Sequence, residues 1–274
     1  MICRRGLVLL LVCMAFSPGH ALATQIVMVV KTSVTVTDQA VNVRLEVANE
    51  GDEDSLVVTP FLAFAGVEAG LETASHIAFA GERLWSHSFP VSDLAFPEAG
   101  TYPLIVRLRY HDAYMYPYSL VSATGVQIGA GLPRDVPLKG EMIATQVTGE
   151  GSLGLRLRNT GGETLKARLT LVSPSELVVA GDSGKLSIPA GEEQRLGYAI
   201  KNNGSLPGSR HNVYAIIEYV SSGQHGVVIL EEGVAVASYV SNKKRTMIIA
   251  SAGFIVLLFF SVLFVEFRTG ASAA

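Results

Sequence analysis

The stretch Arg109–Ser119 holds the densest set of side chains suited to recognising another molecule, and it reads RYHDAYMYPYS. A tyrosine ring offers a large, rigid contact area with a polar tip, which suits the binding of protein or sugar surfaces. The stretch follows an alternating segment, so we expect a hairpin at one end of a β-sandwich, where recognition loops gather. Alternation from Tyr114 to Tyr118 would also cover a sheet face, so sheet packing is the competing interpretation. The predicted partner-binding residues are Tyr110, His111, Asp112, Tyr114, Tyr116 and Tyr118.

Two short motifs resemble catalytic or cofactor signatures without their required context. Gly181–Gly184 reads GDSG, as around the nucleophile of trypsin-like proteases, but no histidine motif of that class accompanies it. Gly149–Gly154 fits G-x-G-x-x-G, yet we expect a strand after it, where a dinucleotide site needs a helix. We therefore expect a protein that is not an enzyme, with no catalytic residues and no cofactor.

Metal ligands are also sparse in the sequence. No two histidines outside the first 23 residues have the local spacing of a metal motif, so we predict no metal site. The acidic segment Glu50–Asp54, EGDED, offers the oxygen ligands that calcium prefers. Thr160–Glu163, its counterpart later in the chain, lacks those charges, and a solvated loop is the simpler interpretation. Whether Glu50–Asp54 binds calcium stays open.

Strands must position these side chains, because alternation of apolar and polar residues recurs along the chain. It is clear in Val41–Val47, Leu104–Tyr110, Leu153–Leu157 and Val213–Tyr219. Such a pattern is typical of strands with one buried and one wet face. Clusters of Gly, Pro, Asn and Asp separate these segments. The sequence therefore predicts an all-β fold.

Three motifs recur in the same order about 110 positions later, which indicates an internal duplication. Asn49-Glu50-Gly51 matches Asn159-Thr160-Gly161, and Ala80-Gly81-Glu82 matches Ala190-Gly191-Glu192, while Tyr110 falls near Tyr219. In Asn-x-Gly we expect Asn to bond its nearby backbone and Gly to accept positive φ. We predict two tandem immunoglobulin-like β-sandwich domains, at residues 24–130 and 135–240, joined by the flexible sequence GAGLP. A single fused barrel is the alternative.

This order of strand, Asn-x-Gly, Ala-Gly-Glu and a strand ending in Tyr resembles the CARDB-type domains, cell-adhesion-related domains of bacterial and archaeal surface proteins. The second copy, LRLRNTGGETLKARLTLVSP…IPAGEEQRLGYAI, also resembles sandwich modules appended to bacterial glycosidases. The resemblance covers nearly all of 24–240. It implies a spacer, adhesion or accessory role without catalytic residues.

The two ends of the chain indicate export and anchoring. Residues 1–23 combine a basic start, a short apolar run and Ala21-Leu22-Ala23, as in a signal peptide. Both cysteines lie in this segment, so we expect no disulfide afterwards. Residues 246–265 carry no charge and are long enough, at about 30 Å, for a transmembrane helix. We expect residues 266–274 to form a short cytoplasmic tail.

The charge balance limits the kinds of partner that we expect the chain to bind. The chain has 21 basic and 24 acidic residues, so it has no electrostatic reason to bind nucleic acid. We expect a single-pass cell-membrane protein with a periplasmic or extracellular ectodomain, which serves interaction, adhesion or scaffolding with a protein or glycan partner. The alternative is an exported accessory subunit of a membrane transport or secretion complex.

Overall fold

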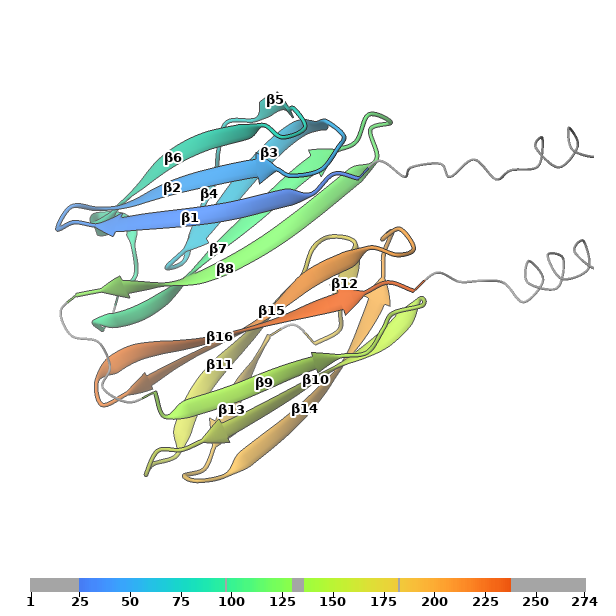
Figure 1. The fold of residues 1–274 in the computed structure, drawn as a ribbon. Helices are drawn as coiled ribbons and strands as arrows, with labels where there is room; N and C mark the ends of the chain where they lie inside the picture. The colour runs from blue at the N-terminus through green and yellow to red at the C-terminus, as the bar shows by residue number, and fades with distance from the viewer. Residues whose placement is uncertain (1–24, 97, 130–135, 182, 238–274) are drawn as a thin grey trace, which may run out of the picture. The chain divides into compact units, whose positions relative to one another are not determined.

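The computed structural model describes residues 25–96, 98–129, 136–181 and 183–237 (Figure 1). Within these residues every regular element is a strand apart from one short 3-10 helix, η1 (Val91–Asp93). The predicted all-β class is therefore confirmed for the described part of the chain. Its sheets are consistent with β-sandwich domains.

The predicted signal peptide at 1–23, membrane helix at 246–265 and tail at 266–274 lie outside the described residues. In the part that the structure describes, no helix has the length and apolar character that crossing a membrane requires.

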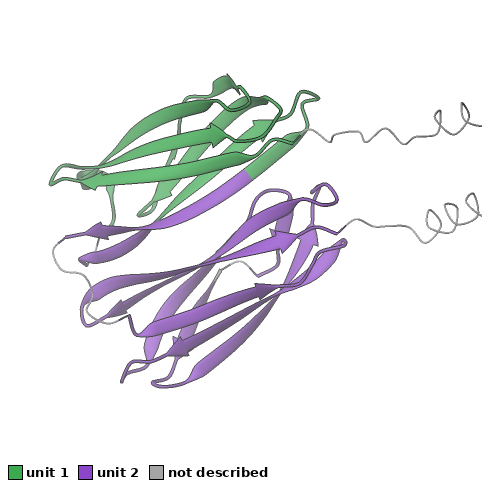
Figure 2. Ribbon diagram, in the orientation of Figure 1, with its two compact units in different colours: residues 1–95, 104–119 green, residues 96–103, 120–274 purple. Residues whose placement is uncertain are grey.

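The described residues form two compact units (Figure 2). The first unit lies within residues 1–95 and 104–119, and the second lies within residues 96–103 and 120–274. The chain thus returns to the first unit after leaving it at Ala95. The domain limits 24–130 and 135–240 stay predictions.

The strands up to Ile128 pair in two groups. One sheet has the order β1–β2–β6, and β3 pairs with β4, β5 and β7, while β8 pairs with β7. Where a register is described, these pairs are antiparallel. The bounds are β1 (Met28–Val36), β2 (Ala40–Asn49), β3 (Ser55–Phe64), β4 (Val67–Gly70), β5 (Ala74–Ile77), β6 (Glu82–Pro90), β7 (Gly100–His111) and β8 (Pro117–Ile128).

The later strands repeat this order. The pairing β1–β2–β6 recurs as β9–β10–β14, and β5–β3–β7–β8 recurs as β13–β11–β15–β16. The copies differ at one strand, because β4 pairs with β3 whereas β12 pairs with β14. The recurrence is what an internal duplication requires. The bounds are β9 (Leu138–Ala144), β10 (Glu150–Asn159), β11 (Leu165–Val172), β12 (Leu177–Val179), β13 (Ser183–Ile188), β14 (Glu193–Asn202), β15 (Arg210–Ser221) and β16 (Gln224–Ala235).

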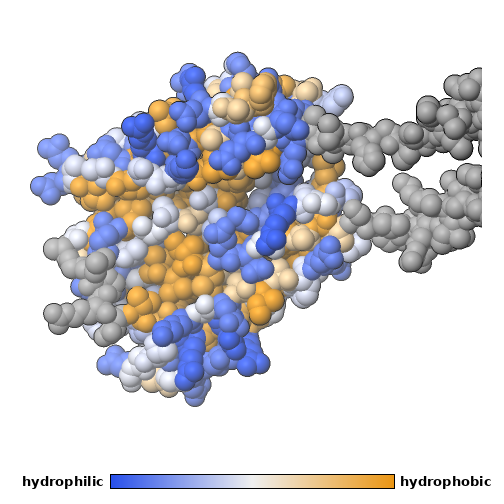
Figure 3. Space-filling model, in the orientation of Figure 1, coloured by the Kyte–Doolittle hydropathy of each residue, from blue (hydrophilic) through white to orange (hydrophobic). Residues whose placement is uncertain are grey.

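Alternating side chains build the core of each unit. In β2, Val41, Val43, Leu45 and Val47 are buried, while the residues between them are exposed or half-buried. Leu153–Leu157 of β10 follow the same rule. On the face drawn in Figure 3, apolar residues gather around β16, and polar residues lie at the edges of that area.

A buried asparagine ends the second strand of each copy, and both have only 1% of their surface exposed. The Nδ2 of Asn49 donates to the Glu53 carbonyl at 2.7 Å and to the Ile77 carbonyl at 3.4 Å, while Oδ1 accepts from Gly51 N at 3.1 Å. Asn159 makes the matching bonds to Glu163 O (2.7 Å), Ile188 O (2.9 Å) and Gly161 N (2.9 Å). Ile77 and Ile188 end β5 and β13, so each asparagine ties its sheet to a strand of another sheet.

Two details of the predicted repeat were wrong. The asparagine bonds to the nearby backbone are confirmed, but neither glycine of the Asn-x-Gly motifs has positive φ. Gly51 is instead required by close approach, because a Cβ there would collide with the Gln25 carbonyl. The second motif is also displaced by one residue, since positive φ occurs at Ala80 (53°) and Gly191 (74°).

We predict that Asn49→Ala lowers the free energy of unfolding of the first unit by about 2 to 4 kcal/mol, because it leaves buried backbone groups without partners. Urea unfolding of the full chain, followed by fluorescence of Trp85, measures this, since the only tryptophan lies in β6 of that unit. Asn42→Ala is the control, because Asn42 is exposed on the same strand. Equal transitions for the two variants would contradict the prediction.

Candidate interaction site

The residues predicted to bind a partner lie at the hairpin between β7 and β8, in the first unit. Tyr110 and His111 end β7, and Tyr118 is the second residue of β8. Across from them β3 has a bulge between Leu56 and Thr59, where Val57 takes a φ of 49°. Bulges of this kind re-aim neighbouring side chains. The predicted hairpin is therefore present, and the side chains that it carries differ in their surroundings.

Asp112 organises the turn of the hairpin. Its Oδ1 accepts hydrogen bonds from Tyr114 N (2.9 Å) and Tyr116 N (2.8 Å), and its Oδ2 accepts from the Tyr118 hydroxyl (3.3 Å). The Asp112 carbonyl also accepts from Met115 N at 3.0 Å. An aspartate that bonds the backbone ahead of it is a common way to fix a turn. Asp112 is thus a support for the loop rather than a free recognition group.

The inner tyrosines pack against one another. Tyr110 is 8% exposed and stacks on Tyr118, with ring centroids 5.6 Å apart. Tyr116 meets Tyr118 edge to face at 5.2 Å. Paired rings of this geometry stabilise more than their buried area alone. The sheet-packing interpretation thus describes these three rings.

Tyr114 is the outward member of the predicted set, with 91% of its surface exposed. Met115 beside it is 54% exposed and has a φ of 62°, in the left-handed region. Sequence reasoning did not include Met115 in the predicted set. Its position at the centre of a loop between two strands was the signal that could have added it. The pair Tyr114 and Met115, here called the hairpin tip, presents apolar surface to solvent.

His111 lies at the base of the hairpin, opposite Leu56 of β3. Its ring is half-buried, and its Nδ1 makes no hydrogen bond within the described residues. His111 thus lies near the hairpin tip in the sequence, and the described residues offer no polar partner to its Nδ1.

The acidic segment Glu50–Asp54 supports the backbone around it. A carboxylate oxygen of Glu53 accepts from Ala113 N in the hairpin at 3.3 Å, and Asp54 accepts from Phe79 N at 2.9 Å. The Asp52 carboxylate accepts a hydrogen bond from the backbone N of Gln25. No group of three His, Cys, Asp or Glu residues suited to a metal occurs in the described part of the chain. Asp52, Glu53 and Asp54 thus support the loop backbone, and the bond of Glu53 reaches the hairpin.

The hairpin between β15 and β16 is plain by comparison. It turns through Ser222 and Gly223, whose φ values are 52° and 71°. Two consecutive positive values are those of a tight two-residue β-hairpin turn. The aromatic tip is therefore a feature of one copy.

Burial, and after it the charge of the Asp112 carboxylate, raise the pKa of the Tyr118 phenol to about 12. The folded chain then keeps a proton that an unfolded tyrosine releases at about pH 10. Stability from this group is complete below about pH 10 and is lost as the pH rises toward 12.

We predict that Asp112→Asn lowers the pKa of Tyr118 from about 12 toward its ordinary value, because the amide keeps an acceptor oxygen without the negative charge. Titration of 13C-labelled tyrosine by NMR measures this shift, and Tyr118→Phe identifies the signal. An unchanged Tyr118 titration in Asp112→Asn would show that the carboxylate has no influence.

Comparison with known proteins places the chain in no family. No family model matches it, and no curated protein matches it. The resemblance to CARDB-type domains therefore stays a prediction.

Solved structures give similarities at low sequence identity. Red sea bream transglutaminase is 12% identical, with 76% of this chain and 31% of that chain covered and a TM-score of 0.27. The native Escherichia coli α2-macroglobulin is 13% identical, with 77% and 17% covered and a TM-score of 0.31. The YadV chaperone is 12% identical, with 76% and 99% covered and a TM-score of 0.30. The chain thus spans less than a third of the first two proteins, and these scores carry no conclusion about function.

Proposed function

We propose that this protein is a non-catalytic, membrane-anchored envelope protein that presents tandem immunoglobulin-like β-sandwich domains to a protein or glycan partner. In this proposal residues 1–23 direct export, residues 246–265 anchor the chain and residues 266–274 lie in the cytoplasm. The ectodomain faces the periplasm or the exterior and acts in interaction, adhesion or scaffolding.

The observation that carries the proposal is the exposure of Tyr114 on a fixed turn. Three hydrogen bonds to the Asp112 carboxylate and one to the Glu53 carboxylate hold the loop, so little conformational entropy is lost when a partner binds. An exposed tyrosine beside an exposed methionine gives a rigid contact and an adaptable one. Because this loop is already ordered, binding avoids the cost of ordering a loop, which weakens many interfaces. The pair therefore supports recognition of a partner's surface.

We predict that Tyr114→Ser combined with Met115→Ser lowers partner capture by about tenfold or more, as expected when the central contacts of an interface are removed. The measurement is crosslinking in producing cells, followed by purification of the tagged full chain and quantitative mass spectrometry. Phe79→Ser is the matched control, because Phe79 is a 63% exposed aromatic residue elsewhere in the first unit. A partner that the double variant retains in full would remove the hairpin tip from the proposal.

The same experiment separates the alternative role. An integral membrane protein recovered in equal amount by wild type and double variant would favour an accessory subunit of a transport or secretion complex. Loss of a soluble or surface partner in the double variant alone favours recognition through the tip.

We predict that the full chain resists extraction from membranes by alkaline carbonate, because an uncharged segment of about 20 residues matches the hydrocarbon core. Deletion of residues 246–274 should release the protein into the soluble fraction. Release of the intact chain by carbonate would contradict anchoring.

A further inference from the structure

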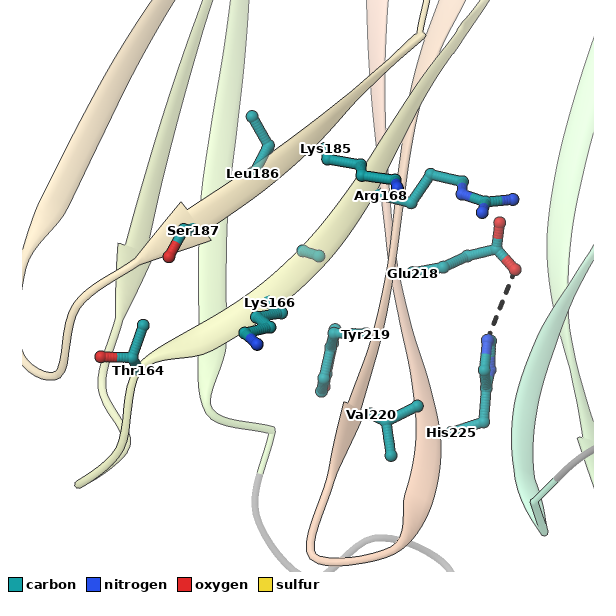
Figure 4. A pocket seen from close by; sticks show the side chains of 11 residues that line it. Thr164, Lys166, Arg168, Lys185, Leu186, Ser187, Glu218, Tyr219, Val220 and His225 are labelled. Carbon is teal, nitrogen blue, oxygen red and sulfur yellow. Dashed lines mark ion pairs between the residues drawn. The ribbon is translucent and has the colours of Figure 1, made fainter.

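Three cations line one pocket in the second unit. Lys166 and Arg168 of β11 and Lys185 of β13 are exposed and border a cavity of about 740 Å³ (Figure 4). Lys166 and Arg168 alternate with the buried residues Leu165, Ala167 and Leu169, so both point away from the core. We call this cavity the cationic pocket.

The strand register places these three residues close together. Arg168 lies directly opposite Lys185 on β13, and Glu218 of β15 lies on its other side. Lys166 is two residues from Arg168 on the same face, which is about 7 Å along a strand, and facing residues on paired strands are about 5 Å apart. Like charges directly opposite one another destabilise a sheet. The arrangement therefore favours a negative group among the three cations.

The lining of the pocket provides one negative group for its three cations. Glu218 is the only carboxylate among the residues that line it. Its Oε1 lies 3.5 Å from Nε2 of His225, and Nδ1 of His225 lies 2.7 Å from the Thr101 carbonyl. Burial by itself lowers the pKa of His225, but the bonds to Glu218 and Thr101 raise it above its ordinary value. Glu218 thus faces both Arg168, opposite it in the strand register, and His225, so the three cations outnumber the one carboxylate.

The other sheet of the same unit pairs several of its cations with carboxylates. On β10 and β14, Arg156 pairs with Glu141 at 2.7 Å, Arg195 with Glu193 at 2.8 Å, and Lys201 with Glu150 at 2.9 Å. In the described residues, no such ion pair involves Lys166, Arg168 or Lys185. Three cations of that sheet are thus paired with carboxylates, whereas Lys166, Arg168 and Lys185 have no such pair in the described residues.

We propose that the cationic pocket binds a phosphate-bearing ligand, with Arg168 and Lys185 as the central contacts and Lys166 beside them. A guanidinium fork matches two phosphate oxygens, and a lysine ammonium adds a compact charge. The hydroxyls of Thr164 and Ser187 line the same cavity and are exposed donors for a phosphate oxygen. The whole chain has a net charge of −3, so its overall charge does not attract anions. Binding must come from this local set, and it is independent of the hairpin tip.

The test uses the full chain in a neutral detergent at low ionic strength. Isothermal titration with inorganic tripolyphosphate should give saturable binding. Arg168→Gln and Lys185→Gln should each weaken it by about tenfold, because each removes a charge-assisted contact. Arg195→Gln is the matched control, since it removes an arginine from the opposite sheet of the same unit and should leave binding unchanged. Far-UV circular dichroism confirms that the variants are folded.

A second set of titrations identifies the source of the phosphate. Mixed micelles containing phosphatidylglycerol are compared with micelles containing phosphatidylcholine. Binding of tripolyphosphate alone supports a soluble phosphate ligand, and preference for phosphatidylglycerol, lost in Arg168→Gln, supports a lipid headgroup. Absence of binding to both probes, or equal weakening in Arg195→Gln, would overturn the proposal.

Discussion

The buried side-chain amides of Asn49 and Asn159 are the constraint on which the described fold depends. A polar group without access to water must find partners inside the protein, and each of these amides has three. One partner closes the turn after the strand, and another is the last carbonyl of a strand in a different sheet. Hydrophobic burial brings sheets together without direction, whereas these bonds specify where one sheet meets the other.

The same amide reaches the hairpin through the loop that it fixes. Asn49 holds the carbonyl of Glu53, and the carboxylate of Glu53 accepts from Ala113 in the turn. Asp112 then fixes the amides of the next residues. The second copy has the first of these contacts, at Glu163, but its two-residue turn offers no comparable loop to support. The same asparagine-bonded turn therefore accompanies two different hairpins in the two copies.

Much of the fold was predictable from the sequence, since strand alternation follows from burial of one sheet face. The hairpin and the asparagine turn bonds could also be expected, because both are local. The inward side of Tyr110 follows from the alternation in Leu104–Tyr110, whereas the exposure of Tyr114 could not be predicted, because it depends on the dihedral angles of the turn. The contact between Glu53 and Ala113 joins residues 60 positions apart, and no sequence pattern predicts it.

The left-handed backbone of Met115 has a consequence for how natural variation at this position should be interpreted. Glycine and asparagine adopt that conformation at lower cost than a methionine does. Drift under backbone preference alone would therefore replace the methionine by one of them. Retention of a bulky thioether or aliphatic group across an evolutionary lineage would point instead to selection on the side chain itself.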